Sequence, residues 1–127
     1  MIILYGIKNC DSVKKAQQWL TQNALGYAFH DFRVQGLTPV LLDAWLHEVG
    51  WEMLLNRRGT TWRQLPDALK TEVDAAAARG LMLAHPTLIK RPVLALDGAH
   101  LVGFADASYR KFFSRHGKQA GTLRGRQ

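Results

Sequence analysis

The sequence predicts an α/β fold: a four-stranded mixed sheet with an all-helical insertion between a βαβ half and a ββα half. Three observations lead to this prediction. Two short apolar runs, at 2–5 and 27–32, flank a helical pattern. Helical character then extends over about 38–90. Sheet character returns in PVLALDGAHLVGF, ahead of a last amphipathic stretch.

The first half begins with a βαβ unit. The run IILY is apolar and β-prone, and Gly6 closes it. Few residues between 11 and 22 break a helix, and the apolar ones recur at helical spacing: Val13, Ala16, Trp19 and Leu20. YAFHDF at 27–32 alternates as a second strand does. A strand, helix and strand within so few residues predict a parallel, right-handed crossover.

The insertion opens with a well-marked helix. Thr38 and Pro39 are typical of an N-cap followed by proline in the first turn, and the helix of 40–49 is expected to end at Gly50. A further helical turn is expected at 51–56.

A second helical start follows at Leu65-Pro66-Asp67. It predicts a helix through DALKTEVDAAAARG that ends at Gly80, and His85-Pro86 indicates the end of one helix and the start of another turn. Because no low-complexity segment separates this block, we expect one domain over 1–127, with an insertion at about 38–90.

The second half is predicted to be a hairpin and a helix. Runs at 93–96 and 101–102 flank DGAH, whose Asp-Gly pair is typical of a tight turn. Asp106 is expected to cap the last helix, which carries Tyr109, Phe112 and Phe113 on one face.

Composition and charge exclude several function classes. No apolar run approaches the roughly 18 residues of a membrane span, so we expect a cytoplasmic protein with no membrane partner. The net charge is +7, and six basic residues but no acid lie within 110–127. The basic tail of about 116–127 has no interleaved aromatic residue to stack on bases, so a nucleic-acid partner is not predicted.

Cys10 is the single cysteine of the chain, so no internal disulfide can form. Its place between a strand and a helix directs backbone N–H groups and the positive helix end at the sulfur. Lowering a thiol pKa from about 8.5 to about 6 takes roughly 3.4 kcal/mol, whereas a helix dipole supplies at best about 2 kcal/mol. A reactive Cys10 therefore needs a cation. The alternative is a small apolar residue that fills the junction.

Two basic segments offer such a cation: NRRGTTWR at 56–63 and LIKRPVL at 88–94. Arginine suits oxyanions and carboxylates because its planar fork donates hydrogen bonds in pairs. A solvated surface role is the alternative for each arginine. The five histidines show no pair at i and i+4, so no metal site is predicted.

These motifs resemble those of the ArsC-like reductase family, which includes arsenate reductases and the Spx regulators, and within it the YffB-like branch. GIKNCDSVKKA, NRRGTTWR, HPTLIKRPVL and LVGF occur in family order over residues 1 to about 115. The resemblance implies a thioredoxin-like fold in which Cys10 is the redox nucleophile. It also implies that Arg58 and Arg91 hold the anion and that Pro92 is a cis proline beside the cysteine. Lys8, Asn9 and Lys14 are expected to contribute to binding substrate or glutathione.

Three positions depart from related proteins. Phe104 stands where glutaredoxin-linked arsenate reductases carry a further arginine. Val13 stands where Spx-type regulators have the second cysteine of C-x-x-C. Ala16 stands where the phosphatase-like arsenate reductases need the arginine of C-x5-R, which excludes that class.

The resemblance therefore implies a glutathione-dependent thiol reductase with a single nucleophilic cysteine and no tightly bound cofactor. Arsenate or a mixed disulfide is the expected substrate, and glutathione or a glutaredoxin the expected reductant, because the chain has no second thiol. The alternative is a non-catalytic Spx-like regulatory or interaction module, whose partner would be RNA polymerase.

Overall fold

The computed structural model describes the backbone of residues 1–120 and the side chains of residues 1–116. The chain forms two compact units, which we call the sheet unit (1–35 and 91 onward) and the helical unit (36–90). Whether the two make one domain stays a prediction. Most of the basic tail predicted at about 116–127 lies outside the described residues. No helix within them is long and apolar enough to cross a membrane.

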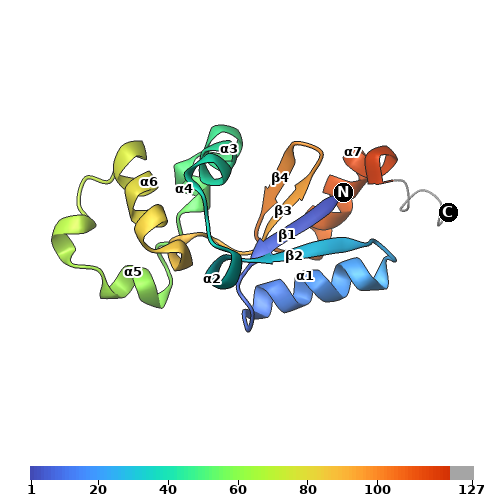
Figure 1. Ribbon diagram of the computed structural model, residues 1–127, viewed down its shortest axis with the longest axis horizontal. Coiled ribbons are helices and arrows are strands. Elements are labelled where there is room, and N and C mark those ends of the chain that lie inside the picture. Colours follow the sequence, from blue (N-terminus) through green and yellow to red (C-terminus); the bar gives the residue numbers. More distant parts are fainter. Residues whose placement is uncertain (121–127) are drawn as a thin grey trace. The chain divides into compact units, whose positions relative to one another are not determined.

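The sheet unit contains four strands in the order β2-β1-β3-β4, seen side by side in Figure 1. β1 (Ile2–Gly6) pairs with β2 (Tyr27–Asp31) in parallel and with β3 (Val93–Leu96) antiparallel. β3 pairs antiparallel with β4 (Ala99–Val102). The predicted four-stranded mixed sheet is confirmed. β1 and β3 are the central strands.

The core of the sheet unit lies on one face of the sheet. Ile2 and Leu4 of β1 stand directly opposite Leu96 and Leu94 of β3, so all four project to the same side. Helices α1 (Asp11–Gln22) and α7 (Asp106–Ala120) cover this face. Their buried residues are the predicted ones: Val13, Ala16, Trp19 and Leu20 from α1, and Tyr109, Phe112 and Phe113 from α7.

The predicted cap of α7 is wrong. Asp106 is the first residue of the helix and not the residue before it. Its carboxylate instead accepts a hydrogen bond from Trp19 Nε1 at 2.8 Å and pairs with Arg110 Nε at 2.8 Å. A tertiary contact with α1 thus uses the oxygens that a cap would need.

The hairpin of β3 and β4 turns at Asp97 and Gly98. Both residues have positive φ, 48° and 87°, as the predicted Asp-Gly turn requires. β4 begins directly after this pair, two residues earlier than the predicted run at 101–102. At the other strand end, Phe32 does not extend β2 but starts the short helix α2 (Phe32–Gln35), which the sequence did not predict.

The helical unit begins with α3 (Pro39–Val49). Thr38 Oγ1 accepts a hydrogen bond from Leu41 N at 3.2 Å, and Gly50 ends the helix at φ 84°, both as predicted. The short helices α4 (Trp51–Leu54) and α5 (Thr60–Gln64) follow. The unit then contains the 3-10 turn η1 (Asp67–Leu69), helix α6 (Ala75–Ala84) and the 3-10 turn η2 (Pro86–Leu88).

The predicted helix from Asp67 to Gly80 is wrong. Only one turn forms at its start, and Glu72 takes the left-handed conformation, with φ 52°. Asp74 then caps a new helix by accepting a hydrogen bond from Ala77 N at 2.8 Å. α6 continues through the exposed Gly80 to Ala84, because the strong stop comes from His85 preceding a proline.

Candidate active site

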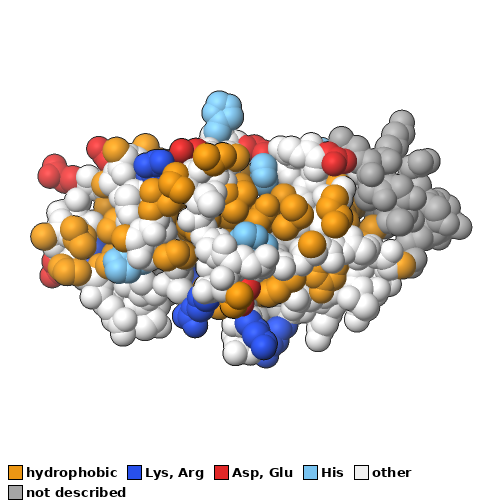
Figure 2. Space-filling model, viewed as in Figure 1, with side chains coloured by type: hydrophobic (Ala, Val, Ile, Leu, Met, Phe, Trp, Pro, Cys, Tyr) orange, Lys and Arg blue, Asp and Glu red, His pale blue; other side chains and the backbone are white. Residues whose placement is uncertain are grey.

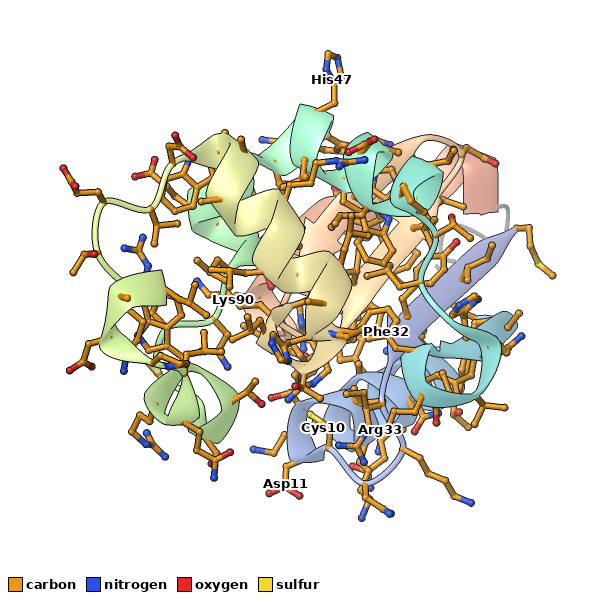
Figure 3. The ribbon with its side chains drawn as sticks, turned by 60° about the vertical axis from the view of Figure 1, so that its left-hand side comes forward. Cys10, Asp11, Phe32, Arg33, His47 and Lys90 are labelled. Carbon is orange, nitrogen blue, oxygen red and sulfur yellow. The ribbon has the colours of Figure 1, made fainter. Side chains whose placement is uncertain are left out.

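The loop between β1 and α1 positions Cys10. Asn9 has φ 72°, a conformation that asparagine tolerates better than most residues, and it turns the chain into the helix. Cys10 is the N-cap of α1, in extended conformation, and its carbonyl accepts a hydrogen bond from Lys14 N at 3.0 Å. Figure 3 shows the Asp11 carboxylate turned away from the Cys10 sulfur. The half-buried thiol thus lies at the positive end of the helix.

The pKa of the Cys10 thiol is lowered from its ordinary value. Burial is the largest single effect and raises this pKa. The Val13 amide, a hydrogen bond and charge from the Arg91 guanidinium, and the Ser12 amide together outweigh burial. Within the described residues Sγ accepts no capping hydrogen bond of regular geometry. The two amides nevertheless lie near enough to favour the thiolate.

The sheet topology brings Arg91 to Cys10 across most of the sequence. β1 and β3 are antiparallel, with Tyr5 opposite Val93, so the end of β1 and the start of β3 meet at one edge of the sheet. Cys10 follows β1, and Arg91 precedes β3. The Arg91–Pro92 peptide bond is cis, as the resemblance implies. Pro92 is buried, and its carbonyl accepts a hydrogen bond from Gly103 N at 2.8 Å.

A cavity of about 540 Å³ adjoins the other side of the Cys10 loop, and Lys8, Asn9 and Lys14 all line it. Three of the four residues predicted to bind substrate or glutathione thus line one cavity, and the fourth, Pro92, does not line it. Their binding role stays a prediction. Asp31, at the end of β2, also lines the cavity and is only 9% exposed. Its carboxylate accepts hydrogen bonds from Lys8 N at 3.3 Å and Arg33 N at 2.8 Å.

Sequence reasoning missed Asp31 as a site residue. The signal was a lone acidic residue at the end of an otherwise apolar and aromatic strand, YAFHDF. Such a residue needs hydrogen-bond donors when it is buried. The backbone amides of Lys8, after β1, and of Arg33, within α2, are the donors to Asp31. The hydrogen bond from Lys8 fixes the base of the loop that carries Cys10.

Arg58 belongs to the helical unit, where its backbone is held from both sides. Its N–H donates to Asn56 Oδ1 at 3.0 Å, and its carbonyl accepts from Arg63 Nη1 at 2.7 Å. The side chain itself is exposed. A Cβ at Gly59 would lie 2.9 Å from Asn56 Nδ2, so a side chain there would displace the amide that binds the Arg58 N–H. The predicted role of Arg58 in holding an anion at Cys10 stays a prediction.

The pattern of residues is that of a known family. The family model described as "ArsC family" matches residues 5–112. The chain belongs to the ArsC family. Two solved structures resemble this ArsC-family chain along most of its length. A protein described as YffB is 48% identical, with a TM-score of 0.84 over 87% of this chain and 97% of its own. An arsenate reductase (ArsC) related protein from Brucella melitensis is 52% identical, with a TM-score of 0.73 over 88% and 93%.

Sequence relatives of this ArsC-family protein fall into more than one group. A protein of Haemophilus influenzae described as uncharacterized is 43% identical, over 90% of this chain and all of its own length. The "Global transcriptional regulator Spx 2" of Bacillus anthracis is 27% identical, over 91% of this chain and 88% of its own. The relatives of this chain therefore include a protein described as a regulator.

Proposed function

We propose that this ArsC-family protein is a cytoplasmic, glutathione-dependent thiol reductase that uses Cys10 as its single nucleophile. The observation that carries the proposal is the position of Cys10 at the N-terminal end of α1 beside the Arg91 guanidinium, whose hydrogen bond and charge contribute to the lowered pKa of the thiol. A thiolate attacks disulfides and oxyanions, whereas a protonated thiol does not. An apolar filler at a strand-helix junction would need no guanidinium beside it.

The reaction on a mixed disulfide of glutathione takes two exchanges. The Cys10 thiolate attacks the glutathione sulfur, a new S–S bond forms, and the substrate S–S bond breaks with its electron pair leaving on the product thiolate. Glutathione thiolate then attacks the same glutathione sulfur in the adduct and forms oxidised glutathione. Cys10 returns to the thiolate. The net change is substrate disulfide plus glutathione giving product thiol plus oxidised glutathione.

The remaining site residues have supporting roles in this scheme. Arg91 stabilises the thiolate as attacking and leaving group, and Arg58 holds the anionic part of the substrate. Lys8, Asn9, Lys14 and Pro92 bind substrate or glutathione. The reductant is glutathione or a glutaredoxin, because the single thiol has no internal partner.

Mixed disulfides fit this chain better than arsenate does. Arsenate is a compact anion that needs several cationic donors around it. Phe104 stands where the related arsenate reductases carry a further arginine, and its ring packs edge-on against Tyr109 at a centroid distance of 4.7 Å. An apolar contact thus occupies a position that would otherwise add positive charge.

Mass spectrometry of the intact chain tests the proposal. After incubation with oxidised glutathione, we expect a glutathione adduct on Cys10, reversed by reduced glutathione and absent in Cys10→Ser. Incubation with arsenate instead tests for an arsenic adduct on the same sulfur. Arg58→Ala should slow turnover of a glutathione mixed disulfide. The neighbouring Arg57→Ala should not, because the Arg57 guanidinium lies over Trp51 at 5.4 Å. An unmodified Cys10 under all conditions would overturn the proposal.

A second function is favoured by the likeness to the Spx 2 regulator. In that case the protein is a non-catalytic module that contacts RNA polymerase, and Cys10 is dispensable for the contact. Pull-down of purified RNA polymerase by the wild type and by Cys10→Ser distinguishes the two. Equal retention by both variants, with no turnover by either, would support the module.

A further inference from the structure

The cavity beside Cys10 differs in character from the Arg91 side of the site. It lies on the β2 side of the loop, because Phe29 and Asp31 of β2 line it, whereas Arg91 and Pro92 precede β3. β2 and β3 flank β1 on opposite sides, and Cys10 follows β1. The Cys10 sulfur therefore has the cavity on its β2 side and Arg91 with Pro92 on its β3 side. A disulfide substrate consists of two groups, and each group can bind on one of these two sides.

The floor and one edge of the cavity are apolar. Val13 and Phe29 line it and close over Gly6, where a Cβ would lie 2.6 Å from Val13 Cγ2 and 3.7 Å from Phe29 Cε1. Val34 of α2 also lines it and is 80% exposed. An apolar ligand that covers Val34 would remove its exposed apolar surface from water, which contributes favourable free energy to binding. At about 540 Å³ the cavity is in the size range of small-molecule sites.

The rim of the cavity carries a net positive charge. Lys8 and Lys14 contribute two positive charges and Asp31 one negative charge, which leaves one positive. The Asp31 carboxylate already accepts two backbone hydrogen bonds, whereas both lysine side chains are exposed. Figure 2 shows Lys and Arg side chains gathered over the N-terminal end of α1. The rim thus favours a ligand with a single negative charge.

Helical spacing aligns the cavity with the sulfur. Val13, Lys14 and Gln17 line the cavity, and they follow Cys10 by three, four and seven residues. Residues at these spacings share one helix face. One half of a disulfide whose other sulfur faces Cys10 can therefore extend along α1 into the cavity.

From these features we infer that the cavity binds the organic half of the disulfide substrate, an apolar, ring-sized group with one carboxylate. This inference rests on the proposed function and deepens it by naming the substrate class. Glutathione itself has no apolar body, so its half falls to the Arg91 and Pro92 flank. The preferred substrates are mixed disulfides of glutathione with apolar, carboxylate-bearing thiols.

Two aromatic disulfides make a matched pair of probes. 5,5′-Dithiobis(2-nitrobenzoate) carries a carboxylate on each ring, and 4,4′-dithiodipyridine carries none. With either one, the Cys10 thiolate forms a new S–S bond to one sulfur, and the other sulfur leaves with the electron pair as a coloured thiolate or thione. The measured ratio is the rate with 5,5′-dithiobis(2-nitrobenzoate) divided by the rate with 4,4′-dithiodipyridine. It reports recognition of the carboxylate, because any change in the reactivity of Cys10 affects both rates.

We expect Lys8→Ala and Lys14→Ala each to lower this ratio by about two- to fivefold, as the loss of a partly exposed charge pair does. Lys15→Ala is the matched control, because Lys15 is an exposed lysine of the same helix that does not line the cavity and should leave the ratio unchanged. Val34→Asp should lower it further, since it replaces an exposed apolar edge with a negative charge.

The outcomes separate the two proposals. If Cys10 reacts with neither probe faster than an ordinary thiol, the proposed function fails. If Cys10 reacts quickly with both probes but the ratio is the same in wild type, Lys8→Ala and Lys14→Ala, the reductase stands and the cavity assignment fails. A ratio that falls equally in Lys15→Ala would also overturn the cavity assignment, because general surface charge would then explain the preference.

Discussion

At the scale of single residues, Arg91 is the side chain that lowers the pKa of Cys10. Burial opposes the thiolate, and the Val13 amide, the Arg91 guanidinium and the Ser12 amide together outweigh that cost. Arg91→Ala should therefore raise the Cys10 pKa and slow iodoacetamide alkylation at pH 6.5 roughly fivefold, the value of about 1 kcal/mol for a partly exposed charge-assisted hydrogen bond. Arg91→Lys keeps the positive charge, so its alkylation rate should lie between those of the wild type and Arg91→Ala. An unchanged alkylation profile in Arg91→Ala would contradict the assigned role.

The lowered pKa of Cys10 also makes the folding stability depend on pH. The folded-state pKa of Cys10 is lowered relative to an unfolded thiol at about 8.5. The stabilisation is therefore present above that unfolded pKa and is lost as the pH falls through the folded pKa. We expect the free energy of unfolding of the wild type, relative to Cys10→Ser, to be greater at pH 9 than at pH 5.5. Urea titrations at both pH values measure it, and the opposite sign would show a thiol that is destabilised as an anion.

At the scale of secondary-structure elements, a cap decides where α6 begins. Asp74 accepts a hydrogen bond from Ala77 N at 2.8 Å, and Asp74→Ala should lower the free energy of unfolding by about 1 kcal/mol. Asp67→Ala is the control, because that side chain is fully exposed and only pairs with Lys70 at 3.6 Å. Urea denaturation of both variants checks this. Equal losses would mean that charge, and not the cap, stabilises this segment.

Elements with their own start and stop signals could be predicted from the sequence. α3 lies between Thr38 and Gly50, and the hairpin turns at Asp97-Gly98, because caps and turns depend on neighbouring residues. The prediction for the stretch after Asp67 failed because a second start signal, the Asp74 cap, lies inside one strongly helical run. Composition predicts helix throughout that run, whereas the left-handed backbone at Glu72 interrupts it ahead of Asp74.

At the scale of the whole molecule, the candidate site could be predicted only in part. The position of Cys10 at a helix start is local and could be read from the sequence. Which cation reaches the sulfur depends on the pairing of β1 with β3, which joins residues about 90 positions apart, and no local pattern fixes such a pairing. The residues alone indicate the basic segment 88–94 as one source of the cation, and the choice of Arg91 within it rests on the family resemblance. The cavity was not foreseen, because β2, α1 and α2 build it together.

Net charge and the single thiol together set how the whole protein responds to oxidation. Each chain carries +7, so two chains repel one another, whereas oxidised glutathione is an anion and is attracted. Diamide takes up two electrons and two protons as the Cys10 thiols of two chains join. Because the chain has one cysteine, this dimer is the only disulfide that copies of the chain can form among themselves.

Salt screens both effects, so it should change the two reactions in opposite directions. Raising the salt concentration from about 20 mM to about 0.5 M should speed dimer formation by diamide and slow adduct formation with oxidised glutathione. Non-reducing gels and intact mass measure the two rates, and Cys10→Ser should show neither product. Only repulsion between whole chains makes dimer formation faster as the charges are screened. If salt slows both reactions, the long-range charge of the chain therefore does not govern them, and local attraction at Cys10 does.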